Sequence, residues 1–272
     1  VGAIEVEKGR VRAVQLEAGE RIPCSLLVSN ADPSMVYTRM IEPRHRRRHS
    51  DRAVARKAHS MSLFVLYFAT RERFPDLAQH SIIQGPRYRE LLRDIFDRKE
   101  LAEDFSLYLH APARTDPEAA PAGQDVFYAL SPVPNQRSGI DWEKAAPLYR
   151  ERIIDALDGG HLPGLRQNLL TAFSVDPRYF EHSLRSYDGA AFGLEPRLMQ
   201  SAYFRYHNRS EEVAGLYFVG AGVHPGAGLP GVLCSARVLE RLVPRPERTL
   251  PLPDRHRPGK PVKAATAAEP VN

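Results

Sequence analysis

The sequence predicts a mixed α/β fold, and two observations carry that prediction. A short, continuously apolar run at residues 216–219 is typical of a strand buried on both faces, and a glycine-dense turn joins it to a helical pattern at 232–243. Elsewhere, short strand patterns alternate with turns and amphipathic helices. With 272 residues, 43% of them apolar and 26% charged, the chain is long enough for one large or two small cores.

Strand patterns are found near the start of the chain and again from the middle onward. We expect strands at 4–6, 11–16, 21–29, 63–68, 81–83, 106–110, 126–130, 169–175 and 216–219. Helices are expected at 86–97, 142–158, 177–184 and 232–243. Asp141 is a suitable N-cap for the second of these, Gly159 ends it, and Trp142 is expected in the core.

The turn between residues 220 and 231 has the composition of a ligand-binding turn. It contains Gly220, Gly222, Gly226, Gly228 and Gly231. Glycine lacks Cβ, so main-chain N–H groups in such a turn can approach a flat or anionic ligand. The start of the following helix adds its positive dipole end. A turn that only lets the helix pack closely on a sheet remains the alternative.

A dinucleotide-binding interpretation of these glycines is weaker. Gly226, Gly228 and Gly231 match G-x-G-x-x-G, but that motif should directly follow a strand and be answered by an acidic residue about 20 residues later. Here the strand ends well before Gly226, and Glu247 lies in a proline-rich tail. We therefore reject a first βαβ unit at this place.

The chain resembles bacterial phytoene desaturases, the FAD-dependent dehydrogenases of carotenoid synthesis. The resemblance covers residues 5–243 and rests on four separated blocks in the family's order, which is more specific than one glycine motif. The blocks are Gly85-Pro-Arg-Tyr-Arg-Glu-Leu91, Leu101-Ala-Glu-Asp-Phe-Ser-Leu-Tyr-Leu-His-Ala-Pro112, Arg205-Tyr-His-Asn208 and Leu216-Tyr-Phe-Val-Gly-Ala-Gly-Val-His-Pro-Gly-Ala-Gly-Leu-Pro-Gly-Val232.

The resemblance implies an incomplete, Rossmann-like FAD-binding domain with an inserted substrate domain of mixed sheet and helix. The expected division is 1–32 for part of the FAD domain, 33–185 for the substrate and membrane-facing domain, 186–243 for the return to the FAD domain, and 244–272 for a disordered tail. The expected cofactor is FAD, and the residues expected to line its site are Gly220, Ala221, Gly222, Pro230, Gly231 and Val232. The family's N-terminal pyrophosphate turn is not found, so we interpret the chain as a C-terminal fragment.

Charge and cysteine content limit the partners. The net charge is +5, and much of the excess lies in residues 44–57, a segment without the neighbouring aromatic residues that stack on bases. We expect this segment to be a solvated helix face, with no nucleic-acid partner. The two cysteines, Cys24 and Cys234, lack partners at metal-ligand spacing, which indicates a reducing, cytoplasmic compartment and no bound metal.

The helix expected at 86–97 carries apolar residues on one face and arginines outside it. Such a helix can lie on an anionic membrane surface, which suits a hydrophobic polyene substrate, although covering a sheet is the simpler interpretation. We expect peripheral membrane association.

The predicted function is FAD-dependent desaturation of a long isoprenoid hydrocarbon such as phytoene. No Ser/His/Asp arrangement or acid pair is found, which fits chemistry carried by a cofactor, and no catalytic residue is assigned. His207 beside Asn208 is interpreted as a loop residue. The alternatives are an amine-oxidase-like oxidoreductase or carotenoid isomerase, and a truncated, inactive chain without FAD.

Overall fold

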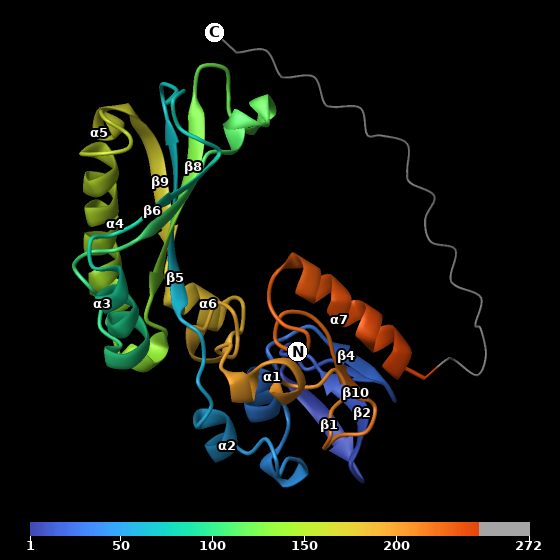
Figure 1. Ribbon diagram of the computed structural model, residues 1–272. Helices are drawn as coiled ribbons and strands as arrows, with labels where there is room; N and C mark the ends of the chain where they lie inside the picture. The colour runs from blue at the N-terminus through green and yellow to red at the C-terminus, as the bar shows by residue number, and fades with distance from the viewer. Residues whose placement is uncertain (245–272) are drawn as a thin grey trace, which may run out of the picture. The chain divides into compact units, whose positions relative to one another are not determined.

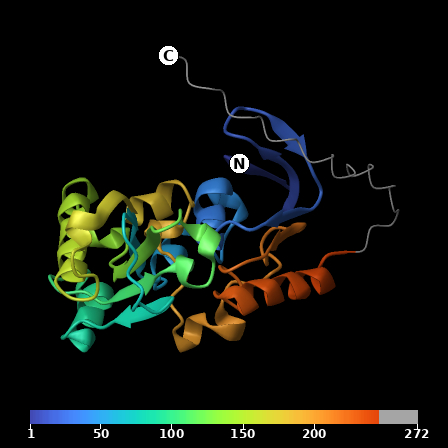
Figure 2. The ribbon, with the colours of Figure 1, turned by 90° about the horizontal axis from the view of Figure 1, so that it is seen from above.

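The computed structural model of the chain describes residues 1–244. The predicted disordered tail at 244–272 therefore lies, except for Pro244, outside the described residues. Val1–Leu242 form one compact unit, shown as a ribbon in Figure 1 and from above in Figure 2. The mixture of helix and sheet confirms the predicted α/β class.

Within residues 1–244 the strands fall into three sheets. A three-stranded antiparallel sheet has the order β1-β2-β3, a parallel pair joins β10 to β4, and a five-stranded antiparallel sheet has the order β6-β7-β8-β5-β9. The bounds are β1 Ala3–Glu7, β2 Arg10–Gln15, β3 Arg21–Pro23, β4 Leu27–Ser29, β5 Ser62–Thr70, β6 His80–Ile83, β7 Leu107–His110, β8 Asp125–Val133, β9 Leu169–Val175 and β10 Leu216–Phe218.

The helices are mostly short. The α-helices are α1 Pro33–Met35, α2 Asp51–Ala55, α3 Tyr88–Arg93, α4 Trp142–Asp158, α5 Leu165–Asn168, α6 Pro177–His182 and α7 Leu229–Leu242. Single-turn 3₁₀ and π segments are η1 Val36–Met40, η2 Pro43–His45, η3 Asp94–Arg98, η4 Pro112–Arg114, η5 Pro117–Ala119, η6 Gln136–Ser138, η7 Tyr187–Gly189, η8 Leu198–Gln200 and η9 Ala202–Phe204.

One face of the five-stranded sheet is covered by α4, as Figures 1 and 2 show. The helix begins as predicted, because Asp141 accepts hydrogen bonds from the main-chain N–H groups of Glu143 and Lys144. Trp142 is buried against Phe64 of β5, which confirms its place in the core. Alternate residues of β8 are fully buried, and Phe64, Leu66 and Phe68 of β5 point into the same core. Leu63 and Val65, on the other face of β5, are buried as well.

A second core joins elements far apart in the sequence. Ile4 of β1, Val11 of β2 and Val36 beside α1 pack against Leu216 and Phe218 of β10. β10 pairs with β4 in parallel, with Leu216 opposite Leu27, so a strand late in the sequence lies beside one near the N-terminus. The buried strand predicted at 216–219 is confirmed.

The single strand expected at 21–29 is wrong. The structure divides it into β3, which pairs with β2, and β4, which pairs with β10. The last hydrogen bond to β2 is donated by the N–H of Cys24 to the carbonyl oxygen of Arg12. The chain then leaves the first sheet, and the N–H of Leu27 donates to the carbonyl oxygen of Gly215 at the start of the parallel pair.

The solvated helix face expected at 44–57 is also wrong in part. Only α2 is α-helical there, and two of the charged or titratable side chains are buried. Arg46 donates from Nε to the carbonyl oxygen of Ile41 and pairs with Asp51. His49 stacks on Tyr37 with ring centroids 4.3 Å apart. Composition showed the charge of the segment but not that Arg46 anchors it.

Two helices differ from their predicted extent. α3 begins at Tyr88 and continues as the π segment η3 to Arg98, and only Leu91 and Ile95 of its expected apolar face are among the buried residues. α7 begins at Leu229, before the predicted Val232. Its sheet-facing residue is Ser235, while Leu229 and Leu233 are 80% and 68% exposed. Cys234 is exposed as well.

Candidate functional site

The glycine turn lies where the two parallel strands end together. Val219 donates its N–H to the carbonyl oxygen of Ser29 at 3.0 Å, and each strand then turns away, at Asn30 and Gly220. Gly220 has φ +101°, and a Cβ there would stand 2.1 Å from Oδ1 of Asn30. In open α/β sheets ligands bind outside the carboxyl ends of parallel strands. The predicted residues therefore occupy the edge at which such folds place a ligand.

Two further glycines are required by close packing. A Cβ on Gly222 would meet Cδ of Pro33 at 2.4 Å, and one on Gly231 would meet the carbonyl oxygen of Gly226 at 2.6 Å. Real Cβ atoms do not approach so closely, so the turn fits against the start of α1 on one side and α7 on the other. A side chain at Gly231 would thus displace the turn itself.

Some main-chain N–H groups of the turn donate hydrogen bonds within the described chain, and others do not. Gly220 donates to Oγ of Ser235 at 2.8 Å, so this N–H holds α7 to the strand end rather than facing a ligand, contrary to expectation. Val232 donates to the carbonyl oxygen of Gly228, and Pro230 has no N–H to donate. Ala221 and Gly222 have no acceptor for their N–H groups among residues 1–244. The same holds for the N–H groups of Gly226, Ala227, Gly228 and Gly231, so the turn has several donors that are not used within residues 1–244.

A pocket of about 540 Å³ lies beside the turn, and we call it the Arg205 pocket. Its lining residues are Ser60, Met61, Phe96, Phe192, Leu194, Glu195, Pro196, Ser201, Ala202, Arg205, Pro225, Gly226 and Ala227. Most of these side chains are apolar. Loops far apart in the sequence form the pocket, which is why the local pattern around the glycines did not predict it.

Arg205 is the buried cation of this pocket, with 6% of its surface exposed. Nη1 donates to the carbonyl oxygen of Leu194 at 3.2 Å, and Nη2 donates to those of Phe192 at 3.2 Å and Ala221 at 2.8 Å. Nε is buried and has no partner among the described residues. Burial lowers the pKa of Arg205, and the nearby carboxylate of Asp32 opposes that shift. The side chain therefore ties the glycine turn to the 192–194 loop.

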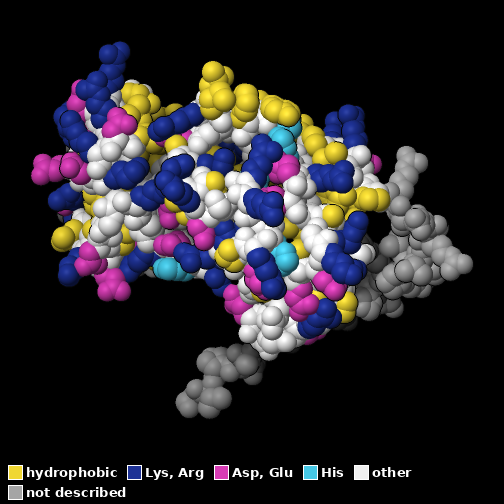
Figure 3. All heavy atoms as spheres, turned by 90° about the horizontal axis from the view of Figure 1, so that it is seen from below, with side chains coloured by type: hydrophobic (Ala, Val, Ile, Leu, Met, Phe, Trp, Pro, Cys, Tyr) yellow, Lys and Arg dark blue, Asp and Glu magenta, His cyan; other side chains and the backbone are white. Residues whose placement is uncertain are grey.

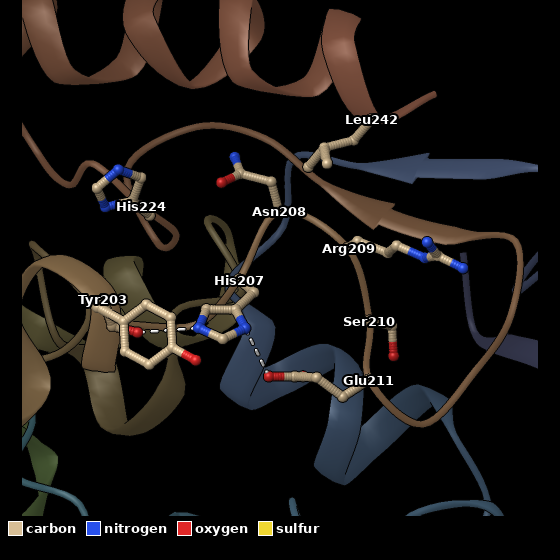
Figure 4. Close-up of a pocket in the computed structure, with 8 residues that line it drawn as sticks. All are labelled: Tyr203, His207, Asn208, Arg209, Ser210, Glu211, His224 and Leu242. Atoms are coloured by element: carbon tan, nitrogen blue, oxygen red, sulfur yellow. Dashed lines mark hydrogen bonds and ion pairs between the residues drawn. The ribbon is translucent and has the colours of Figure 1, made fainter. Parts of the chain in front are cut away.

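Figure 4 shows a second pocket, of about 600 Å³, around His207 and Asn208. His207 lies between the carbonyl oxygen of Tyr203 and Oε1 of Glu211, each 2.9 Å away. Asn208 donates from Nδ2 to the carbonyl oxygen of Phe218 in β10. His207 thus joins two parts of the loop to each other, and Asn208 holds the loop to the strand, which agrees with their interpretation as loop residues.

Glu211 joins two imidazoles in this second pocket. Its other carboxylate oxygen lies 3.2 Å from Nε2 of His49. Burial alone would raise the pKa of Glu211, but the hydrogen bond from His49, its own main-chain N–H and the electrostatic interaction with the imidazoles of His49 and His207 together lower it to about 2. Glu211 is therefore ionised at neutral pH and fixes the two rings.

Sequence reasoning missed a buried polar network between the parallel pair and the five-stranded sheet. Oγ of Ser34 lies 3.1 Å from Nε2 of His59 and 3.0 Å from the hydroxyl of Tyr206. Burial lowers the pKa of His59 to about 4, and the positive charge of Arg137 adds to that shift. His59 is therefore neutral at pH 7. Residues 34, 59 and 206 share no local pattern, so no sequence signal could have joined them.

The fold is one that known oxidoreductases share. An oxidoreductase from Methanosarcina mazei matches 89% of the chain with a TM-score of 0.56 and 17% identity. A putrescine oxidase variant redesigned in its cofactor binding matches 88% with a TM-score of 0.52 and 15% identity. These two likenesses concern the fold, and the chain covers 48% of each of the two solved chains.

In sequence, the chain is homologous to bacterial phytoene desaturases. The neurosporene-forming phytoene desaturase of Cereibacter sphaeroides is 46% identical over 249 residues, which are 90% of this chain and 48% of that protein. The lycopene-forming enzyme of Paracoccus sp. is 43% identical over 244 residues, 89% of this chain and 49% of that protein. The predicted resemblance is thereby confirmed, with the chain spanning about half the length of these relatives. No protein-family model matches the chain.

Proposed function

We propose that the chain forms the part of an FAD-dependent carotenoid desaturase that closes over the flavin ring and holds the hydrocarbon substrate. The observation that carries the proposal is the 46% identity to a phytoene desaturase, together with a turn in which Gly220, Gly222 and Gly231 leave no room for side chains. In this proposal residues 1–32 and 186–243 belong to the FAD domain and 33–185 to the substrate domain.

The site has features that suit a flat, electron-rich ring. The N–H groups of Ala221 and Gly222 lack acceptors among residues 1–244. When bound, the flavin accepts the hydride that no side chain can remove from an allylic C–H bond. The residues of this chain position the ring through these donors, and the apolar side chains of the Arg205 pocket exclude water.

The test uses reassembly with a complementary segment. The chain is co-expressed with the N-terminal half of the Cereibacter sphaeroides relative, and bound FAD and phytoene conversion are measured. We expect FAD near one per pair and conversion of phytoene, whereas the chain by itself retains little FAD and is inactive, since the dinucleotide pyrophosphate needs a glycine turn directly after a strand. A stable pair without FAD would contradict the proposal.

A substitution in the glycine turn tests whether the flavin binds there. In the reassembled pair, Gly231→Val should remove FAD, because its Cβ would meet the carbonyl oxygen of Gly226 at 2.6 Å and displace the turn. Gly2→Ala is the matched control, since a Cβ at Gly2 meets nothing closer than 3.5 Å. Full FAD content in Gly231→Val would exclude these residues from the site.

We further propose peripheral contact with an anionic membrane surface. Among residues 1–244 no helix combines the length and apolar character needed to cross a bilayer. Exposed apolar side chains accompany arginines on α3, where Tyr88 and Leu92 lie beside exposed Arg89 and Arg93. Others lie on η8 and η9, namely Leu198, Met199, Tyr203 and Phe204. Figure 3 shows hydrophobic side chains gathered along one edge of the lower face, next to many Lys and Arg side chains.

Liposome co-sedimentation tests this contact. Binding to anionic vesicles should weaken as salt rises, because each basic residue near the surface contributes about 1 kcal/mol. Leu198→Ser with Met199→Ser should reduce binding at every salt concentration. Leu148→Ser, an equally simple change at an exposed position of α4, should not. Absence of binding at low salt would refute the proposal.

A further inference from the structure

A third pocket, of about 240 Å³, is lined mainly by positively charged residues, and we call it the basic pocket. Its cationic residues are Arg56, Lys57, Lys99, Arg137 and Arg197, and the described residues place one carboxylate, that of Glu195, in the same lining. Arg56 and Arg197 are exposed, and the other three cationic residues are half-buried. A dissolved ligand can therefore reach these side chains.

The positive charge of the basic pocket is only partly balanced within the described chain. Arg197 pairs with Glu195, and Arg137 pairs with Asp188. No carboxylate of residues 1–244 forms an ion pair with Arg56, Lys57 or Lys99. Because like charges repel one another, gathering these three cationic residues at one pocket is unfavourable unless an anion lies among them.

Hydrogen bonds to main-chain carbonyl groups hold the wall of the basic pocket in place. Nη1 of Arg137 donates to the carbonyl oxygen of Lys57 at 3.0 Å, and Nδ2 of Asn135, a further lining residue, donates to that of Ser60 at 2.9 Å. Nζ of Lys99 donates to the carbonyl oxygen of Phe96 at 3.2 Å. Since these contacts form within the chain itself, little ordering of the wall is needed when a ligand binds.

Apolar side chains border the basic pocket. Phe96 of η3 lines it, and Lys99 follows the last residue of η3 directly. On the other side, Arg197 directly precedes Leu198 and Met199 of η8, which are 84% and 65% exposed. The basic pocket thus lies between the two elements proposed above to contact a membrane. A ligand with an anionic head and an apolar tail matches this combination of charge and apolar surface.

We propose that the basic pocket binds the phosphate group of an anionic membrane lipid. The proposal rests on the proposed membrane contact and adds a headgroup site to it. Phosphate oxygens accept charge-assisted hydrogen bonds from arginine and lysine, and a volume of 240 Å³ is several times that of a water molecule, about 30 Å³. The apolar part of the lipid then lies against Phe96 and the exposed side chains of η8.

The test uses dihexanoyl phosphatidic acid, a short-chain lipid that dissolves without vesicles, and the 272-residue chain as it is. Titration calorimetry should show saturable binding of one lipid per chain, and inorganic phosphate should bind more weakly because it lacks the apolar part. Arg56→Gln with Lys99→Gln should weaken lipid binding about tenfold or more, the size expected for lost hydrogen bonds to a charged group. Arg56→Lys with Lys99→Arg, which keeps both charges, should retain binding.

Arg237→Gln with Arg241→Gln is the matched control, since it removes the same charge from exposed positions of α7 and should leave lipid binding unchanged. Circular dichroism verifies that each variant is folded. The proposal is overturned if the wild-type chain does not bind the soluble lipid, if the control loses as much affinity as the pocket variant, or if inorganic phosphate binds as tightly as the lipid and so marks a simple anion site. Co-sedimentation with vesicles alongside any of these results would leave the membrane contact standing without a headgroup site.

Discussion

The five-stranded sheet and the parallel pair differ in how much of their apolar surface the described residues cover. In the sheet, α4 and the strands bury large side chains such as Phe64, Leu109 and Trp142 almost completely. In the parallel pair, β10 is buried, but Val28 of β4 is 40% exposed and α7 presents Leu229 and Leu233 outward.

The difference shows which region is complete by itself. Parallel strands are normally covered on both faces, so the exposed apolar side chains of β4 and α7 form a surface that another segment can bury. The five-stranded sheet needs no such addition on its α4 side. We therefore expect the sheet to supply most of the stability of the chain, and the parallel pair to gain stability from whatever covers it.

The largest expected effect is on the sheet core. Phe64 is fully buried between Trp142 and Tyr149, so Phe64→Ala should lower the free energy of unfolding by about 3–5 kcal/mol. Phe173→Ala, on the open face of the same sheet, should cost about 1 kcal/mol or less, because that ring is 58% exposed and mainly stacks on Tyr67.

Urea unfolding followed by the fluorescence of Trp142, the single tryptophan of the chain, measures both variants. Equal losses for the two substitutions would mean that the open face is covered in solution. The proposed contrast between the two faces of the sheet would then be wrong.

The next largest expected effect is on the pH dependence of stability, and it concerns His59, between the five-stranded sheet and the parallel pair. His59 is buried with a pKa of about 4, against about 6.5 in an unfolded chain. As pH falls from 6.5 to 4 the unfolded state takes up a proton that the folded state does not. The free energy of unfolding should therefore drop by about 3 kcal/mol over this window, and this contribution is fully present above pH 6.5.

Unfolding of the wild type, His59→Gln and His161→Gln is compared at pH 7 and pH 4.5. His59→Gln should lose much of the pH dependence, while His161→Gln, at an exposed position, should keep it. Glu211 acts in a different pH range. Because its pKa is lowered to about 2, the stability that it contributes is lost only as the pH falls below 4.5. An unchanged slope in His59→Gln would show that His59 is not the group responsible.

The sequence predicted elements whose signals are local. The run of aromatic and branched residues in β5, the N-cap Asp141 of α4 and the buried run of β10 are each signals that span only a few residues. What could not be predicted depends on contacts between distant residues. The pairing of β4 with β10, the burial of Arg46 and the Ser34–His59 contact all join segments that only the tertiary structure brings together.

The candidate site also has features that the sequence predicted and features that depend on distant contacts. The glycine turn was found from its composition, but the reason for each glycine was not, since Gly222 and Gly231 are required by Pro33 and by the carbonyl group of Gly226. Arg205 appeared only within a resembling block. Its role depends on the carbonyl groups of Phe192, Leu194 and Ala221, to which no sequence pattern points.

The smallest expected effect tests whether the five-stranded sheet and the parallel pair unfold together. Ser50 is the N-cap of α2 and accepts a hydrogen bond from the N–H of Ala53 at 3.3 Å. Ser50→Ala should lower the free energy of unfolding by about 1 kcal/mol, and Ser50→Gly by only a few tenths, roughly, because glycine is tolerated at this position. Circular dichroism reports all helices, whereas the fluorescence of Trp142 reports the sheet core. If Val1–Leu242 unfold as one cooperative unit, Ser50→Ala shifts both transitions equally. A shift seen by circular dichroism alone would show that α2 and the parallel pair unfold independently of the five-stranded sheet, since a cap on α2 then has no influence on the surroundings of Trp142.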